Sequence, residues 1–102
     1  MNINNLYKII QDRKRKMPKD SYVASLFKLG EDRIIQKVGE EATEVIIAAK
    51  NKDKQKVIFE VADLSLHVLV MLVSLGIRPK EISNELQNRS KKRINRNDKI
   101  LI

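Results

Sequence analysis

Two long stretches with helical periodicity, separated by a break of three residues, most constrain the fold of this chain. In the first stretch, Ile34–Ala49, apolar residues recur close to every 3.6 positions. The second runs from about Asp53 to Leu75, and Asp53 is a good helix N-cap. Because the break Asn51-Lys52-Asp53 is as short as the loops of antiparallel helix pairs, we expect a central helical hairpin in an all-α fold.

The second arm of this hairpin is apolar around nearly its whole circumference. A single neighbouring helix cannot bury such a surface, so we expect a bundle core completed by dimerisation into a homodimer. The run from Val61 to Ile77 is interrupted by Asp63, Ser65 and His67 and falls short of the roughly 20 residues that a membrane span needs. We therefore expect no membrane partner.

Shorter helices flank the hairpin. Asn4 or Asn5 is expected to cap a first helix, and Asp20 or Ser21 a short one through Phe27. Pro79 suits the first turn of a last helix. We expect one all-α domain over residues 1–93 and a frayed basic tail over residues 94–102.

Four carboxylates occupy mirrored positions in the hairpin. Glu41 and Glu44 lie on the first arm, Glu60 and Asp63 on the second, and the two pairs are symmetric about Lys52. Residues three apart share a helix face, so antiparallel arms bring all four acids to one level. Acids at this spacing are also common on solvated helix surfaces, but a carboxylate at the start of an apolar run, as at Asp63, is costly without a partner.

Converging carboxylates either raise their pKa values or bind a cation. Ligation by oxygen alone favours Mg²⁺, with Mn²⁺ as the alternative, over zinc. Because Mg²⁺ in proteins commonly completes its coordination with phosphate oxygens, we expect a small nucleotide or other phosphoanhydride substrate.

Three residues beside the acids have candidate roles. Glu40 is a candidate base for a water at the metal, and a solvent-facing side chain is the alternative. Lys37 and Arg33 form a basic stripe leading to the acids and are candidate phosphate contacts, or ordinary surface residues. Gly39 costs about 1 kcal/mol relative to alanine in a helix, which predicts close packing or ligand approach at this position.

Composition excludes several other chemistries. The chain has no cysteine and one histidine, so a thiol nucleophile and a histidine-rich metal site are excluded. His67 is expected to be a satisfied core or interface histidine. No signal-peptide pattern opens the chain, which indicates the cytoplasm. The net charge of +8 is carried by the two flanks and suits polyanions, so a basic nucleic-acid-binding module is a rival that we do not favour.

The residues from Gln36 to Val45, followed by Glu60-Val61-Ala62-Asp63-Leu64 and His67, closely resemble the phosphoribosyl-ATP pyrophosphatases of histidine biosynthesis. The wider pattern, Glu-Glu-x-x-Glu and then Glu-x-x-Asp, is that of the all-α nucleoside triphosphate pyrophosphohydrolases. Ser21-Tyr22 upstream adds to the likeness, which extends from about Leu6 to Arg93.

The resemblance implies Mg²⁺-dependent hydrolysis of the α–β phosphoanhydride of phosphoribosyl-ATP to phosphoribosyl-AMP and pyrophosphate, in a cytoplasmic dimer. By matching positions it implies that the metal ligands are Glu41, Glu44, Glu60 and Asp63, that Glu40 is the catalytic base or supports the ligands, and that Lys37 contacts phosphate. With Lys37, we expect Arg33, Ser21 and Tyr22 to be the substrate contacts. Val23 and Ser65-Leu66 depart from the usual family residues near the expected substrate contacts. A housekeeping pyrophosphatase acting on other nucleoside triphosphates is the rival within the same fold.

Overall fold

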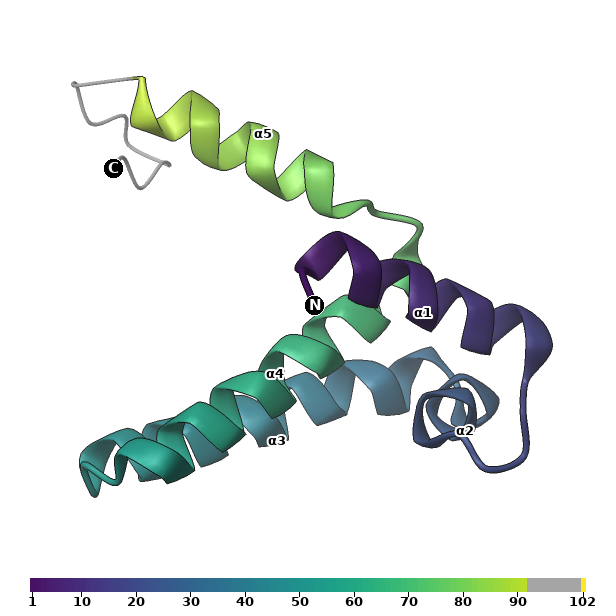
Figure 1. The fold of residues 1–102 in the computed structure, drawn as a ribbon, viewed down its shortest axis with the longest axis horizontal. Helices are drawn as coiled ribbons and strands as arrows, with labels where there is room; N and C mark the ends of the chain where they lie inside the picture. The colour runs from purple at the N-terminus through teal and green to yellow at the C-terminus, as the bar shows by residue number, and fades with distance from the viewer. Residues whose placement is uncertain (92–101) are drawn as a thin grey trace.

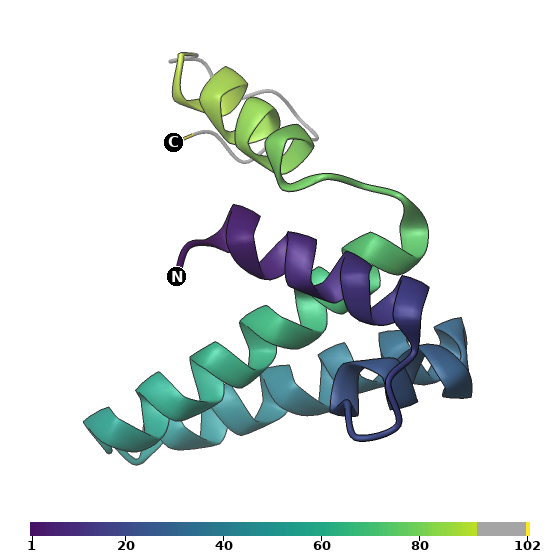
Figure 2. The same ribbon diagram turned by 45° about the vertical axis from the view of Figure 1, so that its right-hand side comes forward.

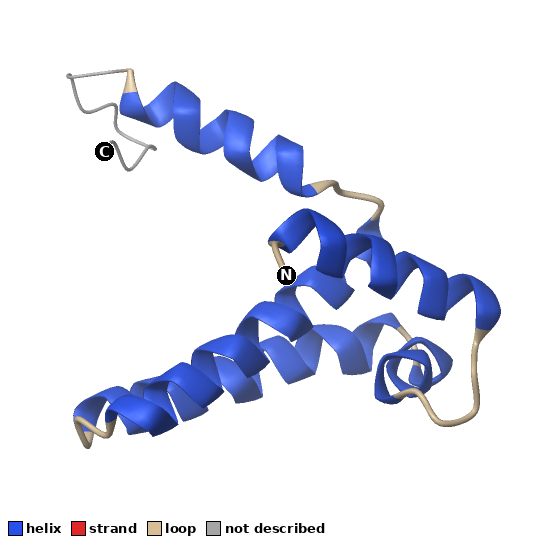
Figure 3. Cartoon of the chain, viewed as in Figure 1, coloured by secondary structure: helices blue, strands red, loops and turns tan. Residues whose placement is uncertain are grey.

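The computed structural model describes residues 1–91 and residue 102, and all the regular structure among them is helical (Figure 3). Five helices follow in order: α1 Ile3–Lys16, α2 Tyr22–Leu29, α3 Glu31–Lys50, α4 Lys54–Leu75 and α5 Pro79–Ser90. The predicted all-α class is confirmed. Of the expected basic tail, residues 94–101 lie outside the described residues.

The two longest helices, α3 and α4, lie side by side as the predicted antiparallel hairpin (Figures 1 and 2). Asp53 caps α4 by accepting a hydrogen bond from the backbone N–H of Lys56 at 3.2 Å. Lys52 closes the turn in the left-handed region, with φ 56°, and Gly76 ends α4 at φ 72°. Local capping therefore sets the length of each arm and the level at which their side chains meet.

The apolar core lies at one end of the hairpin, where α1 and α2 pack against it. Its buried members come from α1, α2, the start of α3 and the C-terminal half of α4: Tyr7, Ile10, Leu26, Ile34, Leu69, Val70, Leu72 and Val73. Across this end the Tyr7 hydroxyl donates a hydrogen bond of 2.8 Å to the carbonyl of Ile77, just after α4. The core thus holds α1 against the C-terminal end of α4.

Two predicted helix limits were wrong in detail. Asn2, and not Asn4 or Asn5, caps α1, because its side chain and that of Asn5 each accept from the other's backbone N–H in a capping box. Ser21 caps α2 as expected, but α2 continues past Phe27 to Leu29 and ends at Gly30.

The other end of the hairpin and α5 leave large apolar side chains exposed. Ile46, Ile58 and Phe59 on the hairpin are 61%, 54% and 64% exposed, and α5 has no buried residue. In Figures 1 and 2, α5 points away from the hairpin, and its most extensive contacts are with α1. α4, with 22 residues, is long and apolar enough to cross a membrane by length and composition alone, so the length argument from the sequence does not exclude a span. Burial of Glu60, His67 and the core residues on α4 favours a packed helix of a globular fold.

Candidate functional site

Three carboxylates converge between α3 and α4, at the inner edge of the apolar core. Glu41 from α3 and Glu60 and Asp63 from α4 each place an oxygen within 4.8 Å of the others. Glu41 and Glu60 are 8% and 5% exposed, and Asp63 is partly buried. Three acids brought so close in a largely dry setting are a donor set that suits a hard divalent cation.

Lys37, one turn before Glu41 on α3, neutralises part of this charge. Its Nζ lies 3.0 Å from Oε1 of Glu41. This contact lowers the pKa of Glu41 and raises the pKa of Lys37, so both groups are held in their charged forms.

Asp63 has the opposite electrostatic environment. Burial, and then the neighbouring Glu41 carboxylate, raise the pKa of Asp63 above its ordinary value. One lysine therefore faces three acids, and among the described residues neither Glu60 nor Asp63 forms an ion pair with a basic side chain. A divalent cation would supply the counter-charge.

Glu44 is not part of this convergence in the structure. Its side chain is exposed one turn further along α3, so three of the four predicted ligands are brought together. Glu44 stays a candidate ligand because it shares the helix face of Glu41.

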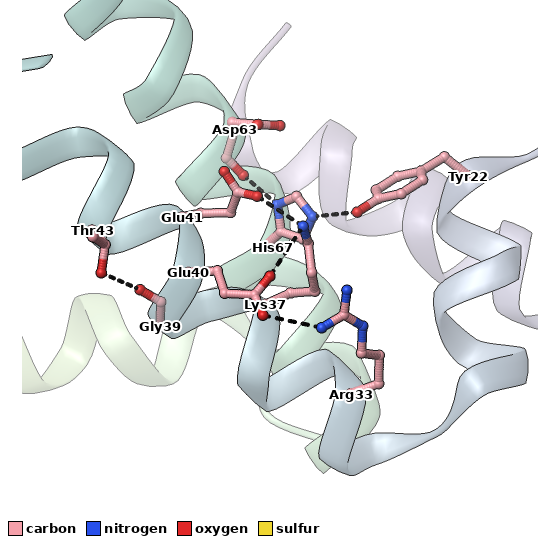
Figure 4. A network of polar contacts seen from close by, with 9 residues as sticks. All are labelled: Tyr22, Arg33, Lys37, Gly39, Glu40, Glu41, Thr43, Asp63 and His67. Atoms are coloured by element: carbon pink, nitrogen blue, oxygen red, sulfur yellow. Dashed lines mark hydrogen bonds and ion pairs between the residues drawn. The ribbon is translucent and has the colours of Figure 1, made fainter. Parts of the chain in front are cut away.

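A chain of ion pairs borders the cluster on α3 (Figure 4). The exposed Glu40 accepts from Nη1 of Arg33 at 3.1 Å and lies 3.6 Å from Nζ of Lys37. Lys37 thus contacts both Glu40 and Glu41, and the predicted base and phosphate contacts lie in one continuous network beside the acids.

The predicted substrate contacts Ser21 and Tyr22 lie differently. The Ser21 hydroxyl caps α2 by accepting from the backbone N–H of Ala24 at 3.1 Å. The Tyr22 hydroxyl lies 2.8 Å from Nε2 of His67, and Nδ1 of His67 lies 2.7 Å from the carbonyl oxygen of Asp63 (Figure 4).

The contact between Tyr22 and His67 was missed from the sequence. The expectation of a satisfied, buried histidine is confirmed, since His67 is 3% exposed and both ring nitrogens have partners. Its link to α2 depends on tertiary packing, because α2 lies against α1 and α3 and reaches α4 here through Tyr22. The available sequence signal for this contact was that Ser21-Tyr22 and His67 belong to the same family pattern.

Gly39 lies on the exposed side of α3. Apart from its two chain neighbours and the backbone of its own helix, no described residue comes within 4 Å of where a Cβ would lie at this position. Packing within the described chain therefore does not explain why position 39 is a glycine. The other predicted reasons, approach by a ligand or close packing against another chain, stay predictions.

Comparison with known proteins agrees with this arrangement. The sequence profile of a family described as phosphoribosyl-ATP pyrophosphohydrolase matches residues 3–90. A phosphoribosyl-ATP pyrophosphatase of Geobacter sulfurreducens is 50% identical over 84 residues, which cover 82% of this chain and 78% of that protein. One from Pelotomaculum thermopropionicum is 47% identical over 91 residues, covering 89% of this chain and 93% of its own length.

A longer relative matches through only part of its length. The histidine biosynthesis bifunctional protein of Caldanaerobacter subterraneus is 48% identical over 90 residues, which cover 88% of this chain but 44% of that protein. The chain is thus similar to one portion of a two-function relative.

Proposed function

The chain belongs to the phosphoribosyl-ATP pyrophosphohydrolase family, a family of hydrolases, and we propose that it cleaves the α–β phosphoanhydride of phosphoribosyl-ATP with Mg²⁺ held by its acidic cluster. The products are phosphoribosyl-AMP and pyrophosphate, and the reaction is an early step of histidine biosynthesis. The observation that carries the proposal is the convergence of Glu41, Glu60 and Asp63 to within 4.8 Å of one another.

The donor set favours Mg²⁺, with Mn²⁺ as a substitute. All three converging groups are carboxylates, and burial together with the Glu41 carboxylate raises the pKa of Asp63, an effect that a bound cation would oppose. Glu44 would join as a fourth ligand through a change of rotamer. When bound, a divalent ion supplies positive charge for the phosphoanhydride oxygens and makes water a better nucleophile.

Lys37 and Arg33 are the proposed phosphate contacts. Both already face carboxylates, which a polyphosphate resembles in charge and in its oxygen acceptors. Negative charge that develops on the leaving pyrophosphate would be offset by these two cations.

Glu40 is the proposed base that takes a proton from the attacking water. It is exposed, so water reaches it, and its ion pairs with Arg33 and Lys37 hold its carboxylate beside the cluster. When phosphate oxygens occupy those cations, the Glu40 carboxylate is released to accept a proton.

The remaining parts of the proposal concern Ser21, Tyr22 and the assembly. Ser21 and Tyr22 are the other two proposed substrate contacts. They lie at the start of α2, and Tyr22 reaches the acidic cluster's neighbourhood by its contact with His67. We take the exposed apolar surfaces of the hairpin and α5 to be covered by a second copy in a cytoplasmic homodimer.

Product analysis tests the reaction. Purified protein is incubated with Mg²⁺ and, separately, phosphoribosyl-ATP, ATP and a non-standard nucleoside triphosphate, and pyrophosphate and the nucleotide products are quantified. The proposal predicts phosphoribosyl-AMP and pyrophosphate in equal amounts, with phosphoribosyl-ATP as the best substrate. Preference for a free triphosphate would instead identify a housekeeping pyrophosphatase.

A further inference from the structure

His67 is a buried polar group that the proposed chemistry does not use. It lies on α4 one turn after Asp63 and touches α2 through Tyr22. The His67 and Tyr22 rings meet edge to face, with centroids 5.6 Å apart and planes at 74°. Two directed hydrogen bonds and this ring contact hold the imidazole in one orientation.

The hydrogen-bond partners determine which ring nitrogen carries the proton. A carbonyl oxygen only accepts, so Nδ1 of His67, 2.7 Å from the Asp63 carbonyl, is the protonated nitrogen. In the neutral imidazole Nε2 is then an acceptor, and the Tyr22 hydroxyl, 2.8 Å away, donates to it. The proton of Tyr22 is therefore committed to His67, and only acceptor lone pairs of the phenol oxygen remain.

Tyr22 itself is open to a ligand. The residue is 50% exposed although its hydroxyl reaches the buried histidine. It lies close enough to Lys37 for the two side chains to interact electrostatically, and both belong to the polar network beside the acidic cluster (Figure 4). A phenol oxygen that only accepts is suited to a hydroxyl or amino hydrogen, and it is unsuited to a phosphate oxygen.

We infer that His67 is a positioning residue that fixes the Tyr22 hydroxyl as a hydrogen-bond acceptor for a hydroxyl or amino group in the nucleoside part of the substrate. This inference rests on the proposed function for its substrate. His67 hydrogen-bonds the backbone carbonyl of Asp63 and not its carboxylate, so we expect the metal affinity of the cluster to be retained when His67 is replaced.

A double-mutant cycle tests the coupling. Tyr22→Phe and His67→Phe each lower kcat/KM about fivefold, the loss of one oriented hydrogen bond, and the double variant loses no more than Tyr22→Phe. His67→Gln, whose side-chain oxygen can still accept from Tyr22, stays within about twofold of the unsubstituted protein. If the two single losses of kcat/KM multiplied, to about 25-fold in the double variant, the inference would be overturned.

Tyr7→Phe is the matched control. Tyr7 also donates one hydrogen bond, to the Ile77 carbonyl, but it lies in the core at the end of α4. Its substitution lowers the melting temperature and leaves kcat/KM unchanged. Mn²⁺ affinity stays within about twofold in all four single variants, and a selective loss in His67→Phe would assign the histidine to the metal cluster instead.

Inorganic tripolyphosphate tests the kind of group that Tyr22 contacts. It offers phosphate oxygens without a nucleoside, so its inhibition constant is expected to be equal in Tyr22→Phe and the unsubstituted protein. An equal weakening of tripolyphosphate and nucleotide would overturn the assignment to the nucleoside part.

Nitrogen-15 NMR of the imidazole gives a readout independent of activity and of the stability of any His67 variant. His67 is the single histidine of the chain, so its signals are unambiguous. The inference predicts a protonated Nδ1 and an unprotonated Nε2 whose resonance shifts in Tyr22→Phe. A ring protonated at Nε2 would overturn it. Loss of phosphoribosyl-ATP hydrolysis in the unsubstituted protein would contradict the proposed function and not this tautomer.

Discussion

The two halves of α4 differ in how completely the chain covers them. In the C-terminal half, Leu69, Val70 and Val73 are at most 7% exposed, whereas Ile58 and Phe59 in the N-terminal half are more than half exposed. The acids Glu60 and Asp63 lie between these halves. One continuous helix thus runs from a packed core to an exposed apolar surface, and the charged site lies between the two.

The largest expected effect comes from the charged site itself. Asp63→Asn keeps the shape of the side chain but removes a ligand charge, so kcat is expected to fall about 10³-fold, corresponding to several kcal/mol of lost transition-state stabilisation. The fold should be retained, which circular dichroism checks. Activity within tenfold of the unsubstituted protein would remove Asp63 from the metal site.

Truncation of one core leucine and one surface isoleucine compares the two halves of α4 directly. Leu69→Ala is expected to lower the free energy of unfolding by about 3 kcal/mol, because it leaves a cavity at a 4% exposed position. Ile58→Ala, at a 54% exposed position, should change the stability of the monomer by less than about 0.5 kcal/mol and weaken self-association instead. Urea denaturation and light scattering over a concentration series separate the two, and equal losses of stability would show that the halves do not differ.

Bound metal should stabilise the folded chain through the acidic cluster. With free Mn²⁺ at 100 times its dissociation constant, the free energy of unfolding is expected to rise by about 2.7 kcal/mol, and chelation should remove this gain together with activity. Denaturation in Mn²⁺ and in chelator measures it. No difference between the two conditions would argue against a site in the folded chain.

The pH dependence of the metal-free protein has a defined sign at Asp63. The pKa of Asp63 is raised in the folded state, so the stability it contributes is present below its unfolded pKa and is lost as pH rises through the folded pKa. Asp63→Asn should therefore be more stable than the unsubstituted protein at pH 7 without metal, and this advantage should shrink in acid. Denaturation in chelator at several pH values tests it, and an advantage that grows in acid would reverse the sign.

The smallest expected effect is at Gly39. Because a Cβ there meets no described atom within 4 Å apart from its chain neighbours and the backbone of its own helix, Gly39→Ala should stabilise the isolated monomer by about 0.5–1 kcal/mol through helix propensity. Thermal unfolding at low concentration measures this. A simultaneous loss of self-association or activity would show that another chain or a ligand covers the α3 face bearing Gly39.

The sequence predicted what depends on local chemistry. Asp53, Gly76 and Pro79 mark helix ends through capping and backbone preference, and the short turn that ends at Asp53 sets the register that brings Glu41 to Asp63. The position of Glu44 was not predictable in this way, because helical spacing gives the face of a side chain but not its rotamer. The contact of Tyr22 with His67 depends on tertiary packing of α2 against α1 and α3, for which no spacing rule exists.

The central claim is that Glu41, Glu60 and Asp63 together form a divalent-metal site, and a Mn²⁺ titration followed by electron paramagnetic resonance tests it most directly. The account predicts saturable binding in the unsubstituted protein and in the control Glu31→Gln, an exposed acid on the same helix as Glu41. Glu41→Gln, Glu60→Gln and Asp63→Asn should each weaken that binding at least tenfold while remaining folded. Undiminished binding in all three variants would contradict the account.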